Sequence, residues 1–213
     1  ELPLMRVLAT MELEGVNLDI QALKDYSLEL GSTIDQLEKE IHELADEEFN
    51  VDSPKQLGII LFEKLAISAK AKKTKTGQYS TGEDVLSKHI NDHEIVPKLM
   101  KYRQLRKLKS TYVDPLPDLV NTNTNRLHTN YMQTIAATGR LSSNNPNLQN
   151  IPIRTEEGRY IRKAFIPRDE NHILLAADYS QVELRIIAAL SEDDAMCEAF
   201  INGADIHAAT ASK

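Results

Sequence analysis

The carboxylates Asp178 and Glu183 are the first candidates for chemistry, because they flank the point where a predicted strand gives way to a helix. The segment DYSQVELR begins at Asp178, directly after an apolar run that predicts a buried strand over residues 173–179. A hard cation such as Mg²⁺ takes oxygen ligands and is commonly held by one or two carboxylates together with substrate phosphates. Asp178 supplies half of such a site, and it could instead cap the helix that begins near Gln181. Glu183 cannot share that capping role and stands beside the same strand end, which favours the metal site.

A segment rich in amides, TGRLSSNNPNLQNIP, covers residues 138–152 and includes Arg140. Gly139 permits a close approach of the backbone to a partner, and the segment offers many hydrogen-bond donors and acceptors without regular periodicity. Arginine and amide side chains can bond the acceptors of a duplex minor groove, which are nearly the same for every base pair. Such contacts would sense the shape of a duplex without reading its sequence. The alternative interpretation is a surface loop whose Asn residues form Asx turns.

The net charge of −7 argues against nucleic-acid binding only if the chain is taken as a whole. Residues 1–49 hold 3 basic and 13 acidic side chains, whereas residues 50–113 hold 13 basic and 6 acidic ones. The basic side chains of this middle third gather in a predicted loop and on a predicted long helix, at Lys70, Lys72, Lys73, Lys75, Lys98, Lys101, Arg103, Arg106, Lys107 and Lys109. A charge run is usually a solvated face, but this concentration in an acidic chain favours contact with phosphates.

The other reactive side chains exclude several classes of chemistry. His89 and His93 lie four residues apart with no third ligand nearby in the sequence, so we interpret them as surface residues. His207 follows Asp178 closely enough to face the same cleft. The sequence contains no glycine-rich phosphate loop, no GxSxG motif and no Cys/His nucleophile pattern, which argues against nucleophilic catalysis by the protein.

Cysteine use and hydropathy predict a cytoplasmic chain. The single cysteine, Cys197, excludes an internal disulfide and a cysteine-rich zinc site, and it fits a reducing compartment. No stretch approaches the roughly 18 apolar residues of a membrane span, and no signal-peptide pattern is present. The chain begins with Glu1 and stops at Lys213 inside a helical pattern without a Gly, Asn or Pro stop signal, so we expect a piece of a longer polypeptide.

Two long helices are predicted to form an arm. Asp19 caps the first, in which apolar residues recur every three or four positions from Leu23 to Leu44 over a helix of about 40 Å. A short helix from Ser53 to Leu65 and a loop over residues 68–81 follow. The second long helix begins at Pro97 and can pair with the first through one apolar face, formed by Leu99, Tyr102, Leu105, Leu108 and Tyr112.

The pattern changes after Pro115. A strand is predicted over residues 126–135 and an irregular segment over residues 144–152. Helices are then predicted over residues 181–190, over residues 193–200 and from Asp205 onward. A short helix that ends at Gly15 precedes the arm. The sequence therefore predicts an α+β fold, in which a long antiparallel helical arm is attached to part of a domain with an antiparallel sheet flanked by helices.

Three motifs together resemble the DNA polymerase I family, also called family A DNA polymerases: TGRLSSNNPNLQNIP from Thr138, DYSQVELR from Asp178 and DIHAATA from Asp205. The segments SPKQLGIILFEKL from Ser53 and KLKSTYVDPLP from Lys107 look like the thumb of that family. The resemblance thus covers essentially the whole chain. It implies a helix within residues 1–18 that leads into the polymerase region, a thumb over residues 19–120, and the N-terminal part of the palm over residues 121–213, ending where the fingers would begin.

The resemblance also implies a role for each matching residue. Asp178 would bind two Mg²⁺ ions, with the backbone carbonyl of Tyr179 completing one site, and Glu183 would exclude a 2′-hydroxyl from the incoming nucleotide. The deoxynucleoside triphosphate would be contacted by Gln181, Arg154 and His207. Primer-template DNA would be contacted in the minor groove by Arg140, Asn147, Gln149 and Asn150, and along the thumb by Lys70, Lys72, Lys73, Lys75, Lys107, Lys109 and Thr111.

The implied reaction is in-line attack of a primer 3′-hydroxyl on the α-phosphate of the nucleotide, assisted by two metal ions. The family supplies a second carboxylate from a His-Asp-Glu motif and grips the triphosphate from a fingers helix. Both would lie beyond Lys213, so we expect negligible activity from the chain by itself. We also expect the chain to be a monomer. Two alternatives stay open. One is a non-catalytic duplex-DNA-binding module that uses the basic thumb, and the other is an RNA polymerase with a similar palm, which would differ in the sugar discrimination assigned to Glu183.

Overall fold

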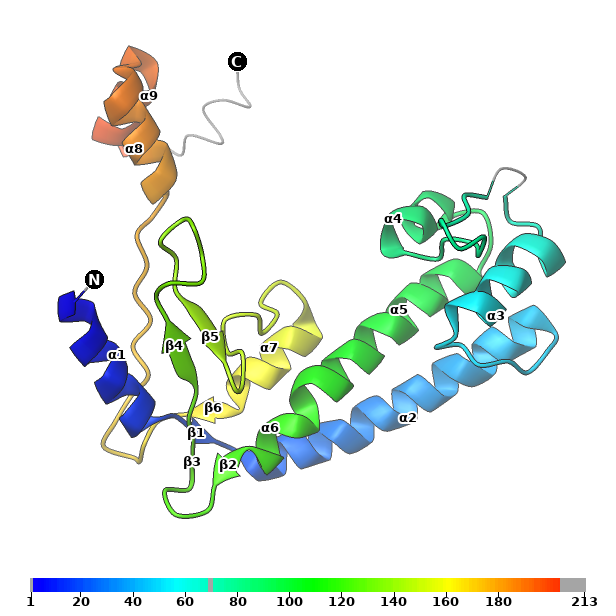
Figure 1. Ribbon diagram of the computed structural model, residues 1–213, viewed down its shortest axis with the longest axis horizontal. Helices are drawn as coiled ribbons and strands as arrows, with labels where there is room; N and C mark the ends of the chain where they lie inside the picture. Colours follow the sequence, from blue (N-terminus) through cyan, green and yellow to red (C-terminus); the bar gives the residue numbers. More distant parts are fainter. Residues whose placement is uncertain (1, 69–70, 204–213) are drawn as a thin grey trace. The chain divides into compact units, whose positions relative to one another are not determined.

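The computed structural model describes residues 2–68 and 71–203 (Figure 1). It divides into two compact units, residues 1–172 and residues 173–213, and each is described by itself. Within the described ranges no helix combines the length and the apolar character that a membrane crossing requires.

The first unit opens with α1 (Leu2–Glu14), which ends at Gly15 as the sequence predicts. Gly15 has a φ of 63°, and a Cβ atom at this position would lie 2.7 Å from the carbonyl oxygen of Leu127. Glycine is therefore required here for both its conformation and its size. The guanidinium of Arg126 covers the end of the helix, because its Nε donates to the carbonyl of Glu14 at 2.5 Å and its Nη2 to that of Gly15 at 2.8 Å.

Two long helices, α2 (Ile20–Ala45) and α5 (Ile95–Leu108), run antiparallel and side by side in an arm (Figure 1). The Asp19 side chain accepts a hydrogen bond from the backbone nitrogen of Ala22 at 2.9 Å, which confirms the predicted cap. The two helices share a buried interface, formed mainly by Leu23, Leu30, Ile34, Ile41, Leu99, Tyr102, Leu105 and Leu108. The predicted pairing of the helices is therefore confirmed, although α5 begins two residues before Pro97.

The far end of the arm is built from short elements. Ser53 caps α3 (Pro54–Ile59), whose last turn widens into the π-helix η1 (Ile60–Lys64). After the predicted loop come α4 (Glu83–Leu86) and η2 (Ser87–His89), which lead into α5. The apolar residues of these pieces continue the core of the arm, at Leu57, Leu61, Phe62, Val85 and Leu86.

The predicted apolar face of the second long helix is buried as far as Leu108, and its last member, Tyr112, packs partly buried against the same core although the helix changes type there. After Leu108 the chain forms a π-helix, η3 (Lys109–Val113), in which the backbone nitrogen of Asp114 donates to the carbonyl of Lys109 at 3.0 Å. A π-turn inserts one residue into the helical repeat. Within this turn Val113 is fully buried and Tyr112 is partly buried.

Small antiparallel sheets form the base of the first unit, together with the helices α6 (Pro115–Asp118) and α7 (Glu156–Lys163). Each sheet has two strands, and the pairs are β1 (Asn17–Leu18) with β6 (Phe165–Ile166), β2 (Val120–Asn121) with β3 (Arg126–Leu127), and β4 (Asn130–Met132) with β5 (Ser142–Asn144). The strand predicted over residues 126–135 is thus two short strands, because its two halves pair with different partners. The α+β class is confirmed.

The second unit contains α8 (Val182–Ser191) and α9 (Asp194–Ile201), close to the predicted ranges. The two helices pack through buried Ala188, and the guanidinium of Arg185 lies 4.5 Å from the centre of the Phe200 ring. Asp193 caps α9 through the backbone nitrogen of Met196 at 2.8 Å. The helix predicted from Asp205 lies outside the described residues.

The buried strand predicted over residues 173–179 is wrong. This segment has no regular structure, and Ile173 and Leu175 are 84% and 86% exposed. A strand satisfies its backbone groups only by pairing with neighbouring strands, and none of the described residues pairs with this segment. The apolar side chains of this segment are therefore exposed, although their sequence is typical of a buried strand.

Candidate nucleic-acid interface and metal-ligand segment

The amide-rich segment is mounted on the β4–β5 hairpin. Tyr131 of β4 lies opposite Ser143 of β5 in the antiparallel register, so the tip of the hairpin contains Gly139 and Arg140. Gly139 has a φ of 76° and no atom lies within 4 Å of the place where a Cβ would stand. Arg140 is exposed. The hairpin tip therefore carries an exposed arginine, next to a glycine around which there is room for a partner to approach.

The amides that follow the hairpin are held by a buried hydroxyl. Ser143 is 1% exposed, and its Oγ accepts a hydrogen bond from the backbone nitrogen of Leu148 at 3.0 Å and lies 3.3 Å from Oδ1 of Asn147. The same Oδ1 accepts from the backbone nitrogen of Gln149 at 3.1 Å, which is an Asx turn. Asn147 thus serves its own loop, whereas the side chains of Gln149 and Asn150 are exposed beyond it.

The segment between the amides and α7 carries Arg154. Its neighbour Ile151 is 8% exposed and anchors the chain in the core, while Arg154 itself is exposed. Thr155 caps α7 by accepting from the backbone nitrogen of Gly158 at 3.1 Å. Arg154 is therefore held next to a rigid helix start, and its predicted contact with a nucleotide stays a prediction.

The basic side chains of α5, and that of Lys109 directly after it, form contacts within the first unit. Most of them have a partner, and the pairs are Lys98 with Glu40, Lys101 with Glu157, Arg103 with Thr81, Arg106 with Asp52, and Lys109 with Asp114. The hydrogen bond from Lys98 lowers the pKa of the Glu40 carboxyl group. Helix α5 is therefore less available to phosphates than its charge suggests.

Lys109, predicted to bind DNA, illustrates this most clearly. Its Nζ donates to the Asp114 carboxylate at 2.8 and 2.9 Å and to the Ser27 hydroxyl at 2.7 Å. Burial alone would raise the pKa of Asp114, but the hydrogen bonds from Lys109 and Ser27 outweigh it and lower that pKa. Lys107 and Thr111 are exposed on the same stretch, so they are the better candidates for contact with DNA there.

The lysine-rich loop at the end of the arm forms a small hairpin, which we call the lysine hairpin (residues 72–80). Lys73 and Tyr79 form a β-bridge, and the turn closes where the backbone nitrogen of Thr74 donates to the carbonyl of Gln78 at 2.7 Å. Tyr79 packs on Phe62 of the core at 5.2 Å between ring centres. The hairpin exposes the basic residues Lys72, Lys73 and Lys75. Lys70, the fourth predicted lysine, lies outside the described residues.

The metal-ligand segment lies in the second unit. Asp178 and Tyr179 are exposed, and Gln181, with a φ of 53°, begins α8 without a side-chain cap. The alternative reading of Asp178 as the cap of this helix is therefore not supported. The chain turns into α8 where the Nε of Arg185 donates to the carbonyl of Ser180 at 3.0 Å.

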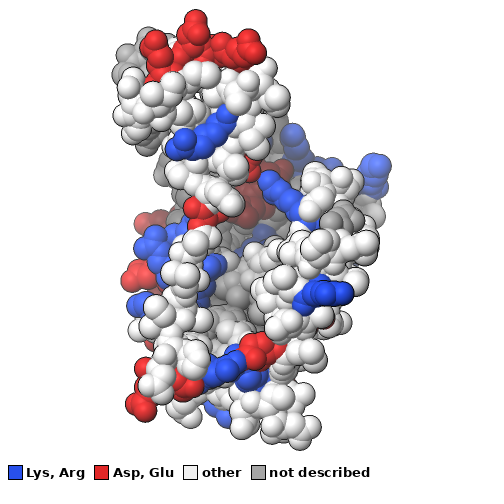
Figure 2. Space-filling view, turned by 90° about the vertical axis from the view of Figure 1, so that its left-hand side faces the viewer, with Lys and Arg blue, Asp and Glu red and all other residues white. Residues whose placement is uncertain are grey.

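The donors of this segment are the oxygen type that Mg²⁺ prefers, namely a carboxylate and a backbone carbonyl. They do not complete a site, because the described residues contain no group of three His, Cys, Asp or Glu side chains that could hold a metal ion. Glu183 lies exposed in the first turn of α8, where a negative charge suits the helix dipole. His207 lies outside the described residues. Acidic side chains also gather at the far end of this unit (Figure 2), in the α8–α9 turn at Glu192, Asp193 and Asp194.

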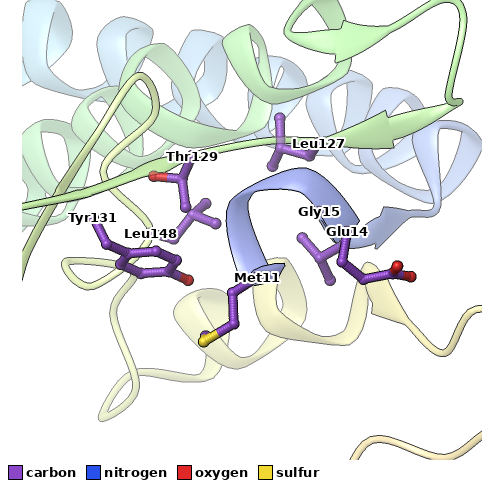
Figure 3. A pocket seen from close by; sticks show the side chains of 8 residues that line it. Met11, Glu14, Gly15, Leu127, Thr129, Tyr131 and Leu148 are labelled. Carbon is purple, nitrogen blue, oxygen red and sulfur yellow. The ribbon is translucent and has the colours of Figure 1, made fainter. Parts of the chain in front are cut away.

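A cavity of about 200 Å³ lies behind the amide segment, between α1 and the strands β3 and β4 (Figure 3). Its lining is formed by Met11, Glu14, Gly15, Val16, Leu127, Thr129, Tyr131 and Leu148. The Thr129 hydroxyl lies 3.0 Å from the carbonyl oxygen of Asn144 and 2.7 Å from that of Pro146, so this wall also supports the loop. The cavity is mostly apolar and contains none of the predicted site residues.

Comparison with solved structures defines the class of protein to which this arrangement belongs. The chain superposes with a TM-score of 0.86 on a structure described as the POL domain of Pol1 from M. smegmatis in complex with DNA primer-template and dNTP. The two sequences are 44% identical, and the match covers 97% of this chain and 36% of that one. The fold is that of part of a polymerase domain.

The sequence comparisons narrow the class to one family. Residues 20–213 match the profile of DNA polymerase family A. The chain is 50% identical to DNA polymerase I of Bacillus subtilis (strain 168) over 99% of its length, and 51% identical to the thermostable DNA polymerase I of Thermus aquaticus over 100%. The chain belongs to DNA polymerase family A, which confirms the resemblance drawn from its motifs. It spans about a quarter of the length of these relatives, 24% and 25%.

Proposed function

We propose that this chain is the thumb and the first part of the palm of a DNA-directed DNA polymerase, with the thumb over residues 19–120 and the palm from residue 121. Its partners would be primer-template DNA and deoxynucleoside triphosphates. The observation that carries the proposal is the similarity to a polymerase domain whose structure contains both of these ligands, at 44% identity over 97% of this chain.

Two surfaces of the first unit support binding of duplex DNA. The β4–β5 hairpin and the loop after it expose Arg140, Gln149 and Asn150, which can donate to the minor-groove acceptors common to all base pairs. The lysine hairpin exposes three ammonium groups that can contact phosphates. Both surfaces recognise features that every duplex shares, as an enzyme that copies any template requires.

The proposed reaction joins the primer 3′-oxygen to the α-phosphorus of a nucleotide and releases pyrophosphate. The Asp178 carboxylate and the Tyr179 carbonyl are the residues here that would hold divalent metal ions. Such ions, two in the complete enzyme and Mg²⁺ by preference, would stabilise the attacking and leaving oxygens. Glu183 would lie against the sugar and exclude a 2′-hydroxyl. The nucleotide would also be contacted by Gln181, Arg154 and His207.

We expect the 213-residue chain alone to bind DNA without extending a primer, since its described residues do not complete a metal site. Joined to the remaining polymerase region of the Bacillus subtilis relative, the chain should support primer extension. Asp178→Ala should then reduce the rate by about a thousand-fold, the several kcal/mol that a catalytic metal contributes. An unchanged rate in the variant would refute the role of Asp178. Glu183→Ala should increase ribonucleotide use relative to deoxyribonucleotide use.

The second candidate, a non-catalytic duplex-binding module, is favoured only by the exposed lysine hairpin. It predicts that the joined protein binds DNA but never extends a primer, and that Asp178→Ala changes nothing. A primer-extension assay of the joined protein with Asp178 unchanged therefore distinguishes the two functions.

A further inference from the structure

The arm and the amide-rich loop are tied together by one short hydrogen bond. The hydroxyl of Tyr112, at the end of the arm nearest the sheets, donates to the backbone carbonyl of Asn150 at 2.6 Å. The two residues are 38 positions apart in the sequence. The bond therefore connects the element that carries the lysine hairpin with the loop that exposes Gln149 and Asn150.

Tyr112 makes this bond from within the π-helix η3. Along α5 the buried face includes Leu99, Tyr102, Leu105 and Leu108. In η3, which follows, Val113 is fully buried. Tyr112 packs partly against the core, and its hydroxyl reaches the loop. Departures of this kind from a regular helix frequently occur at functional sites.

The loop needs an anchor at this position. Leu148 is held by its backbone bond to Ser143, and Ile151 is buried, but the side chains of Gln149 and Asn150 between these two points are exposed. A backbone that is fixed at both ends can still rotate its central peptide groups. The bond from Tyr112 restrains the carbonyl of Asn150 and with it the direction of the two amide side chains.

We propose that Tyr112 is a positioning residue, which holds the loop in the conformation that presents Gln149 and Asn150 to the minor groove of bound duplex. This inference rests on the proposed function of the loop. If only a fraction of the molecules has the loop in the binding conformation, the apparent affinity falls by that fraction. Loss of one hydrogen bond of ordinary net strength should therefore weaken duplex binding about five-fold.

The test compares the full chain with its Tyr112→Phe variant, which keeps the aromatic ring and removes only the hydroxyl. Binding is measured with a primer-template duplex and with a matched duplex whose terminal purines are 3-deaza analogues and so lack the N3 acceptor of the minor groove. Tyr160→Phe is the control, because Tyr160 is a half-exposed tyrosine that stacks on Tyr26 in the same unit, away from the loop. Circular dichroism and thermal melting confirm that each variant is folded.

The unaltered chain and Tyr160→Phe should both lose affinity when the N3 acceptors are removed. Tyr112→Phe should bind the ordinary duplex about five-fold more weakly than the unaltered chain does. Removing the N3 acceptors should reduce the affinity of this variant by a smaller factor than it reduces that of the unaltered chain. Tyr112→Phe could bind the ordinary duplex more weakly and still lose as much affinity as the unaltered chain when the N3 acceptors are removed. This result would overturn the positioning role, because the lost affinity would then be unrelated to the minor groove. A variant that binds as tightly as the unaltered chain would also overturn it and leave the proposed function intact. If the unaltered chain is itself insensitive to the acceptors, the minor-groove function of the loop fails, and the role of Tyr112 fails with it.

Discussion

Replacement of the three described lysines of the lysine hairpin should weaken the salt dependence of DNA binding. Lys72, Lys73 and Lys75 are exposed, and the Nζ of Lys73 lies 4.5 Å from the centre of the Tyr79 ring, which limits the freedom of its side chain. Each ammonium that neutralises a phosphate contributes about 0.9 to the slope of log affinity against log salt concentration. The triple change to alanine should therefore reduce the magnitude of that slope by about 2.7 if each lysine contacts one phosphate.

The assay is fluorescence anisotropy of a labelled primer-template duplex, titrated with the chain at several NaCl concentrations. Between 50 and 200 mM salt, a slope difference of 2.7 corresponds to about 40-fold in relative affinity, so the effect is easily measured. The matched control removes three lysines that already have carboxylate partners, Lys64, Lys98 and Lys101. It changes the net charge equally and should leave the slope nearly as it is.

Equal slopes for the unaltered chain and the hairpin variant, with folding intact, would refute the reasoning that the hairpin contacts phosphates. Equal reductions in the hairpin variant and the control would refute the distinction between exposed and paired lysines. In that case the overall charge of the arm, rather than the particular residues, would govern the interaction.

Three further predictions concern stability. Gly15→Ala should destabilise the first unit by at least ~1 kcal/mol in chemical denaturation, because φ is positive and the added Cβ would lie 2.7 Å from the Leu127 carbonyl. Asp19→Ala should cost about 1 kcal/mol through loss of the α2 cap, and Asp19→Asn should restore most of it. Burial raises the pKa of Glu157, but hydrogen bonds led by that from Lys101 outweigh it and lower the pKa below 4.5. Its contribution to stability is therefore present above the pKa of the unfolded chain and is lost as the pH falls through the lower folded pKa, so Glu157→Gln should make the melting temperature fall less steeply on acidification.

The helical arm could be predicted from the sequence because its signals are local. The Asp19 and Ser53 caps, the glycine stop at Gly15 and the three-and-four spacing from Leu23 all act over a few residues, and the structure places each helix close to its predicted range. The family could be predicted for a similar reason, since its motifs are short and contiguous. The roles that the motifs imply for single residues are still predictions.

The structure differs from these predictions wherever distant residues decide the outcome. The apolar run before Asp178 predicts a strand, yet among the described residues it has no partner strand and stays exposed. The basic residues of α5 predict a phosphate-binding face, yet most of them meet a carboxylate or hydroxyl elsewhere in the unit. The local sequence pattern indicates neither the missing partner strand of the apolar run nor the distant partners of the basic residues.

The sequence by itself determined the long helices of the arm and the two helices of the second unit to within a few residues, and which residues carry oxygen, amide and ammonium groups suited to metal and DNA. Hydrogen bonding along the backbone and apolar spacing are sufficient for that. Only the tertiary structure decided which of those groups face outward. The bond from Tyr112 to Asn150 shows the reason: it joins residues 38 positions apart, and no local pattern in the sequence indicates which distant group a side chain will meet.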